Sequence, residues 1–142
     1  MHHFASVVLV DDRGWILLQE RDQQADLDPE KWGFVGGHRE PGEDYLACAY
    51  RELTEETGLT LTDGLELVGE FQFFSEPCDE TDEFQLFACR THLTDADIVC
   101  GEGRQIVFVD PADAAGLDLT ASAQIALPAF LESDLYRTMG AA

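Results

Sequence analysis

The chain has 142 residues, of which 45% are hydrophobic and 10% aromatic, so it can fold around a core and does not have the composition of a disordered chain. Its 29 acidic residues against 8 basic ones give a formal net charge of −21, which disfavours binding to nucleic acid backbones and to anionic membranes. No apolar run reaches the roughly 18 residues of a membrane helix, and no secretory cleavage site follows the first apolar run. We therefore expect a single domain over residues 1–142, located in the cytoplasm, with no nucleic acid or membrane partner.

Strand signals dominate the first part of the chain. The apolar runs Phe4–Val10 and Trp15–Arg21 predict two strands, and the turn sequence Asp11–Gly14 joins them as a hairpin. The polar stretch Gln23–Glu30 contains a proline and is predicted to be a loop. A short strand is then expected over Lys31–Gly36.

A helix is predicted next. Pro41 and Gly42 are unfavourable inside a helix, so it should begin at Glu43 or Asp44. Gly58 suits the position just past the helix end, where a left-handed backbone costs glycine nothing. The apolar residues at three- and four-residue spacing, which predict the buried stripe, are Leu46, Ala49, Tyr50 and Leu53.

The second half of the chain alternates between strand, turn and helix signals. Strands are predicted over Leu61–Ser75, Glu83–Arg90 and Gln105–Val109, with an acidic turn over Glu76–Asp82 and a loop over Thr91–Arg104. A short helical turn is expected at Pro111–Gly116. The last predicted helix is Ala121–Leu135, which Pro128 either kinks or divides by starting its second half.

The predicted central helix carries a face of carboxylates. Glu52, Glu55 and Glu56 lie at positions i, i+3 and i+4, so they project from one side, and Arg51 is one turn before Glu55 and could orient it. Oxygen ligands of this kind bind hard divalent cations, which serve phosphate chemistry. An acidic, solvated helix face is the other interpretation, and the spacing alone leaves both open.

The segment Gly37–Leu59 resembles the signature of the Nudix hydrolase family, G-x5-E-x7-R-E-U-x-E-E-x-G-U, in which U is a bulky aliphatic residue. Every specified position is filled, by Gly37, Glu43, Arg51, Glu52, Leu53, Glu55, Glu56, Gly58 and Leu59. The resemblance implies an α/β fold, an α/β/α sandwich with a mixed sheet in which the signature forms a loop–helix–loop metal site. Strands on both sides of a central helix agree with mixed sheets between helices.

The resemblance also implies roles for residues of the signature. It makes Glu52, Glu55 and Glu56, with the backbone carbonyl of Gly36, the ligands of Mg²⁺ or Mn²⁺. Glu52 alternatively accepts the proton of the attacking water, and Arg51 orients one of the acids. The supporting positions are Glu43 and Gly37.

Outside the signature, the expected residues are less specific. Many family members have a further glutamate on a downstream loop, as metal ligand or as base, for which Glu102 is the candidate and Glu83 the rival. Arg21 and Arg39 could contact outer phosphates, or lie on the surface. A nucleotide base could stack on one of four aromatic residues that are otherwise expected in the core: Trp32, Phe34, Phe73 and Phe84.

The negative charge fits a metal-dependent enzyme. A polyphosphate would be repelled by this chain unless divalent cations arrive with it, and adaptation to a salty environment would also account for the acidity.

The resemblance implies a hydrolase that cleaves the diphosphate linkage of a nucleoside diphosphate derivative, with a nucleoside triphosphate favoured because the chain carries no large insertion. Alternatives are a nucleotide-sugar hydrolase and a nucleotide-sensing module that does not cleave; the acidic surface disfavours RNA decapping, and an isomerase would depart from the full signature. A homodimer is compatible with the family.

Overall fold

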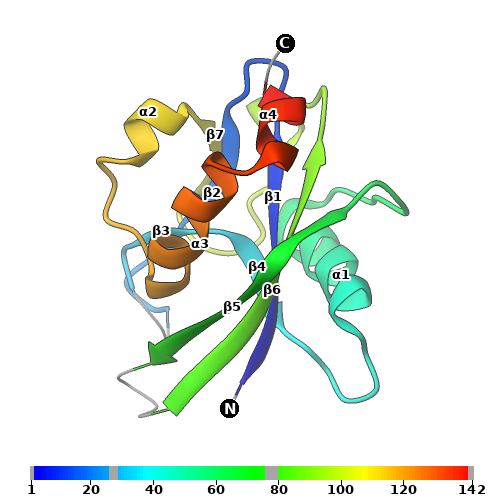
Figure 1. Ribbon diagram of the computed structural model, residues 1–142, viewed down its shortest axis with the longest axis vertical. Coiled ribbons are helices and arrows are strands. Elements are labelled where there is room, and N and C mark those ends of the chain that lie inside the picture. Colours follow the sequence, from blue (N-terminus) through cyan, green and yellow to red (C-terminus); the bar gives the residue numbers. More distant parts are fainter. Residues whose placement is uncertain (1, 26–28, 76–79, 141–142) are drawn as a thin grey trace.

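The computed structural model describes residues 2–25, 29–75 and 80–140. These residues form a seven-stranded sheet and several helices, arranged as Figure 1 shows. The strands are β1 (His3–Val10), β2 (Ile16–Glu20), β3 (Trp32–Gly33), β4 (Val35–His38), β5 (Glu66–Ser75), β6 (Glu80–Arg90) and β7 (Gln105–Val109). The helices are α1 (Tyr45–Thr57), α2 (Pro111–Ala114), α3 (Ala121–Leu131) and α4 (Asp134–Gly140), with a 3₁₀ turn, η1, at Asp95–Asp97.

The central strand β1 decides how the sheet divides. One edge of β1 pairs in parallel with β6 along its whole length, and β6 pairs antiparallel with β5. The other edge pairs antiparallel with β4 over Phe4–Val7 and meets β2 only where Val10 faces Ile16. β2 continues to β3 on one side and β7 on the other. The sheet is mixed because β1 and β6 are parallel while its other pairs are antiparallel. Because β4 and β2 share one edge of β1, the sheet opens between them.

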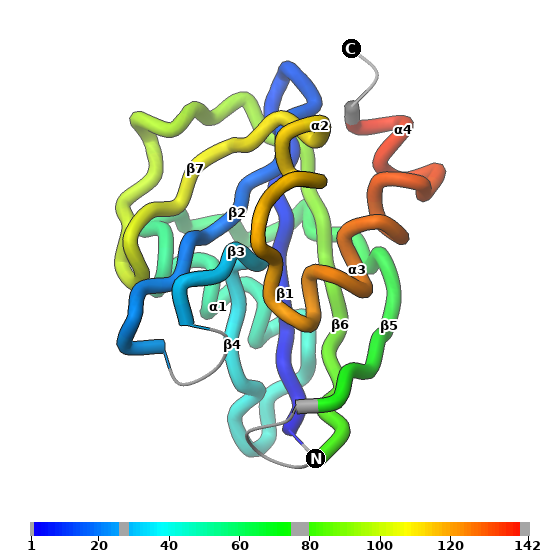
Figure 2. The backbone as a smooth tube through the Cα atoms, turned by 90° about the vertical axis from the view of Figure 1, so that its left-hand side faces the viewer, coloured from blue at the N-terminus to red at the C-terminus, as the bar shows by residue number. Residues whose placement is uncertain are grey.

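Helices cover both faces of the sheet, with α1 on one side and α3 and α4 on the other (Figures 1 and 2). Side chains of β1 alternate between the two cores, as the two-residue period of a strand requires. Ala5, Val7 and Leu9 pack toward α1, whereas Val8 and Val10 pack toward α3 and α4. Among the described residues, no helix combines the length and the apolar character needed to cross a bilayer.

The signature helix α1 ends before Gly58 as predicted, but it begins at Tyr45, just after the predicted start at Glu43 or Asp44. Asp44 is its N-cap and accepts a hydrogen bond from the Ala47 N–H at 2.7 Å, and Gly58 has a φ of 76° and donates to the Thr54 carbonyl at 2.9 Å. The predicted buried stripe was wrong at Leu46, which is 41% exposed. Packing against β1 and β4 instead buries a stripe that includes Cys48, Ala49, Leu53, Glu56 and Thr57. Because this face of α1 packs on the sheet, the side chain of Glu56 is buried.

Other predicted boundaries also differ. The strand expected over Lys31–Gly36 is two strands, β3 and β4, separated at Phe34, and the strand expected from Leu61 begins at Glu66. In the predicted acidic turn, residues 76–79 lie outside the described residues, but Glu80–Asp82 already belong to β6 because they pair with the end of β5.

The last predicted helix is two helices. α3 continues through Pro128 and ends at Leu131, and the second helix starts at Asp134 rather than at the proline. Ser133 explains the break, because its hydroxyl donates to the Phe130 carbonyl and accepts from the Tyr136 N–H at 3.1 Å. One side chain thus satisfies backbone groups at the end of α3 and the start of α4.

Candidate active site

A cleft of about 710 Å³ lies where the sheet opens between β4 and β2. The signature helix forms one wall, with Arg51, Glu52, Glu55 and Glu56. The lining also includes Phe4, Gln19, Arg21, Phe34, Gly36, Gly37, His38, Phe73, Phe84 and Glu102. The cleft therefore brings together the signature, the predicted loop glutamate and most of the predicted aromatic residues.

Glu56 is the most buried acid of the cleft, with 5% of its surface exposed. One carboxylate oxygen accepts a hydrogen bond from the Gly36 N–H at 2.9 Å, which fixes the side chain against β4. Burial, with added repulsion from Glu52 and Glu102, raises the pKa of Glu56 to about 8. The chain alone therefore holds this acid largely protonated at neutral pH.

Glu52 lies against Gly37, in the strand β4 that opens the signature. A Cβ atom added to Gly37 would lie 2.5 Å from the Glu52 carboxylate oxygen, so a larger residue at this position would displace the carboxylate from where it lies. Burial is the main cause that raises the pKa of Glu52, and the neighbouring Arg51 opposes the shift. Glu52 is thus a carboxylate held close to the backbone with its charge only partly compensated.

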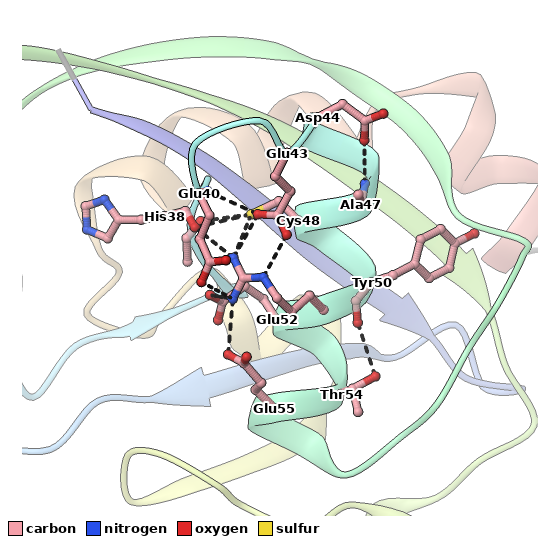
Figure 3. Close-up of polar contacts among 12 residues, drawn as sticks. His38, Glu40, Glu43, Asp44, Ala47, Cys48, Tyr50, Glu52, Thr54 and Glu55 are labelled. Atoms are coloured by element: carbon pink, nitrogen blue, oxygen red, sulfur yellow. Dashed lines mark hydrogen bonds and ion pairs between the residues drawn. The ribbon is translucent and has the colours of Figure 1, made fainter.

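The Arg51 side chain donates hydrogen bonds to several groups around α1. Figure 3 draws these bonds and labels the partner residues. It donates from Nε and Nη2 to both oxygens of Glu43 at 2.8 and 2.9 Å, and from Nη1 to Glu52 at 2.9 Å and Glu55 at 3.2 Å. Its Nη2 also donates to the His38 carbonyl at 3.0 Å. Hydrogen bonds from Arg51 lower the pKa of Glu43 to about 2. One guanidinium therefore positions three acids and the end of β4.

Glu102 reaches the cleft because its loop is tied at both ends. The Gly101 N–H donates to the Glu56 carbonyl at 2.7 Å, and Gln19 Nε2 donates to the Glu102 carbonyl at 2.9 Å. A Cβ atom on Gly101 would lie 2.6 Å from the Glu55 carbonyl oxygen, so the loop approaches α1 as closely as a glycine allows. The rival Glu83 accepts a hydrogen bond from Tyr45 at 2.7 Å and does not line the cleft.

Some of the residues predicted to contact the ligand line the cleft, and others lie outside it. Arg21, Phe34 and Phe84 line it, although the two rings are 5% and 1% exposed. Arg39 lies outside, with its guanidinium carbon 4.7 Å from the centroid of the Tyr45 ring, so its placement does not support the expected phosphate contact. Trp32 also lies outside the lining.

Sequence reasoning missed Gln19, Phe4 and His38 as lining residues. Gln19 is a buried polar residue, 6% exposed, that directly follows the apolar residues Ile16–Leu18 of β2. Because Glu20 and Arg21 come next, no signal in the sequence marks Gln19 as buried. Phe4 and His38 carried no local signal.

The donor set of the cleft fits a hard divalent cation. It consists of carboxylate oxygens, and two of the acids, Glu52 and Glu56, have pKa values raised by burial, so a cation would compensate charge that the chain leaves uncompensated. Within the described ranges, Glu52, Glu55 and Glu56 do not form a group with ligand atoms within 4.8 Å of one another, and Arg51 holds Glu52 and Glu55. Sharing one ion would therefore require these side chains to turn.

Comparisons with known proteins show which family the chain belongs to. The family model described as the NUDIX domain matches residues 1–130. An uncharacterized Nudix hydrolase of Yersinia pestis is 36% identical over 92 residues, which are 64% of this chain and 49% of that protein, so the match spans about half of the relative's length. Because the family model covers most of the chain, the chain belongs to the Nudix family.

Solved structures show the same fold. A MutT NUDIX hydrolase from Burkholderia pseudomallei matches with a TM-score of 0.74 at 20% identity, covering 89% of this chain and 95% of that one. The NUDIX domain of Shewanella oneidensis NrtR, solved with ADP ribose, matches with a TM-score of 0.75 at 15% identity, covering 91% and 85%. These matches confirm the predicted Nudix fold with a mixed sheet.

Proposed function

We propose that the protein is a divalent-metal-dependent hydrolase that cleaves the diphosphate linkage of a nucleoside diphosphate derivative, with a nucleoside triphosphate as the favoured substrate. The observation that carries this proposal is the arrangement of Glu52, Glu55, Glu56 and Glu102 on one cleft together with a complete Nudix signature. A cleft of about 710 Å³ also has the size of a small-molecule site.

The proposed cation is Mg²⁺ or Mn²⁺, held by Glu52, Glu55, Glu56 and the carbonyl of Gly36. When bound, the ion supplies neutralisation of phosphate charge and lowers the pKa of a coordinated water. A chain with a net charge of −21 repels a polyphosphate, so compensation of charge at this site is also what allows the ligand to approach.

The residues of the chain have separate proposed roles. Glu52 or Glu102 accepts the proton of the attacking water, because both carboxylates face the cleft and the pKa of Glu52 is already raised by burial. Arg51 is a positioning residue that fixes Glu52 and Glu55, and Glu43 in turn fixes Arg51. The N–H of Gly36 orients Glu56.

The part of the cleft that Phe4 and Phe73 line is proposed to hold the nucleoside. Phe4 and Phe73 are only partly buried and their ring centroids lie 6.0 Å apart, so they present more surface to a base than the buried Phe34 and Phe84 do. Arg21 lines the same cleft and is the proposed contact for outer phosphates.

Two similar structures bear on the class of substrate. Fold similarity to a MutT NUDIX hydrolase and the absence of a large insertion favour a nucleoside triphosphate. The similar NUDIX domain solved with ADP ribose favours a nucleotide sugar as the second candidate. A sensing module that does not cleave is disfavoured, because the chain retains every acid of the signature.

The test is a turnover screen over nucleoside triphosphates and nucleotide sugars with Mg²⁺ or Mn²⁺, in which the products are identified. We expect a nucleoside monophosphate and pyrophosphate from a triphosphate, and a nucleoside monophosphate and a sugar phosphate from a nucleotide sugar. Glu55→Gln should lose the activity, whereas Glu132→Gln, an exposed acid at the end of α3, should keep it. Turnover that survives both Glu55→Gln and a chelator would overturn the proposal.

A further inference from the structure

A second group of potential metal ligands lies just before β1 and at the start of β6, next to the cleft residue His38. His2, Glu80 and Asp82 each offer one ligand atom, and these atoms all lie within 4.8 Å of one another. The His2 ring centroid is 5.3 Å from that of His38, a cleft residue, and His38 in turn lies 4.4 Å from the ring of Phe4. The group is thus separate from the signature acids but adjacent to the proposed nucleoside end.

Backbone pairing fixes this group in place. The His2 N–H donates to Asp82 Oδ1 at 3.0 Å, and the Glu83 N–H donates to the His2 carbonyl at 2.9 Å. The imidazole Nε2 of His2 lies 2.8 Å from a Glu80 oxygen, and these two side chains are 42% and 34% exposed. A ligand from solvent can therefore reach the imidazole and Glu80 while the backbone beneath them is held by strand pairing.

Asp82 is the feature that an ordinary surface ion pair does not explain. Its exposed fraction is 0%, and its Oδ2 finds no hydrogen-bond partner in the described parts of the chain. Its strand partner on β5 is Phe73, so one side of its environment is apolar. A buried carboxylate oxygen without a partner is costly, and the bond from His2 accounts only for Oδ1.

We propose that His2, Glu80 and Asp82 form a binding site for a first-row transition metal ion of the Zn²⁺ class, distinct from the Mg²⁺ or Mn²⁺ site of the signature. An imidazole nitrogen with two carboxylates suits Zn²⁺, whereas Mg²⁺ and Ca²⁺ take oxygen ligands. Two carboxylates match the charge of the ion, and the ion compensates the buried oxygen of Asp82. Three protein ligands leave a fourth position open to water or to a ligand group from the cleft.

The test is a calorimetric titration of Zn²⁺ into the full chain. The protein is first freed of metal with a chelator, and excess Mg²⁺ is present during the titration to occupy the signature acids. The protein is prepared without a histidine tag, because tag histidines would themselves bind Zn²⁺. We expect one Zn²⁺ per chain, bound at least about tenfold more weakly by Asp82→Asn and by His2→Gln. Glu80→Gln, at a partly exposed position, should show the same loss, and thermal unfolding checks that each variant is folded.

Two controls distinguish this site from an ordinary surface histidine and from the signature acids. His92→Gln removes an exposed histidine that also pairs with a carboxylate, Asp12, at 2.7 Å but has no buried acid beside it, and it should bind Zn²⁺ as the unchanged protein does. Glu56→Gln should retain the Zn²⁺ site, because the signature acids are not its ligands. The proposal is overturned if no Zn²⁺ binds in excess Mg²⁺, if Asp82→Asn and His2→Gln bind it equally well, or if Glu56→Gln abolishes it. The imidazole nitrogen resonances of His2, which should shift with Zn²⁺, give a readout that is independent of the variants.

Discussion

Glu43 and Glu56 belong to one sequence signature but lie in opposite electrostatic environments. Glu43 receives two hydrogen bonds from the Arg51 guanidinium, at 2.8 and 2.9 Å, and its pKa is lowered to about 2. Glu56 is buried, accepts the Gly36 N–H and is repelled by Glu52 and Glu102, and its pKa is raised to about 8. The fold compensates the first acid with its own arginine, whereas the second is the acid for which we propose a cation from solution.

The largest expected effect comes from removing the charge of the acid that depends on the cation. Glu56→Gln keeps an oxygen that can accept the Gly36 N–H but removes the charge, so kcat/KM should fall on the order of 100-fold or more. The measurement is steady-state kinetics on the substrate found in the screen, with Glu132→Gln as the matched surface control. Equal activity of Glu56→Gln and the unchanged protein would show that the proposed metal ligation by Glu56 is wrong.

The stability of the metal-free protein should respond to pH in the direction that the raised pKa of Glu56 dictates. A folded-state pKa above the unfolded value stabilises the fold at low pH, and this contribution is lost as pH rises from about 4.5 to about 8. In chelator, the unfolding temperature should therefore fall across this window, and Glu56→Gln should be more stable than the unchanged protein near pH 8. For a domain of this size, each kcal/mol lost from the free energy of unfolding lowers the unfolding temperature by about 4 °C.

Added Mg²⁺ sharpens this experiment. Binding to the folded state should raise the unfolding temperature of the unchanged protein near pH 8 and have much less effect on Glu56→Gln. Calorimetric scans with and without the ion measure both quantities. A flat pH profile in chelator would contradict the buried, cation-dependent position of Glu56.

The smallest effect is expected at the compensated acid, with the opposite pH dependence. The lowered pKa of Glu43 contributes stability above about pH 4.5, and this contribution is lost as pH falls toward 2. Glu43→Gln should therefore cost about 1 kcal/mol at neutral pH, the scale of a hydrogen bond to a charged group in a partly solvated setting, and little near pH 2. Denaturant unfolding at both pH values provides the measurement, and an equal cost at both would rule out the charge as its origin.

Local chemistry made much of the fold predictable. The cap residues Asp44 and Gly58 and the apolar runs of β1, β6 and β7 act through their immediate neighbours, and the structure places these elements close to the predicted ranges. Leu46 was assigned to the buried stripe because spacing alone does not fix which side of α1 meets the sheet. The break between α3 and α4 was missed because it depends on Ser133 and not on the more conspicuous Pro128.

The candidate site was predictable in its residue types and less so in its connections. Helical spacing put Glu52, Glu55 and Glu56 near one another, and the family resemblance gave their proposed roles, which stay predictions. Sequence spacing linked Arg51 to Glu55, but its shortest bond is to Glu43, eight residues earlier and outside the helix. That contact arises because the chain folds back before α1 begins.

The sequence by itself determined the family, the carboxylate face of α1 and the glycine that ends it, because these depend on residue identity and on spacing within a few turns. Only the tertiary structure decided which acid is compensated by the chain and which is buried without a counter-charge. The reason is that a pKa depends on solvent exposure and on charges brought from distant segments. Gly36 on β4 and Glu102 on its loop reach Glu56 only when the sheet has formed around α1.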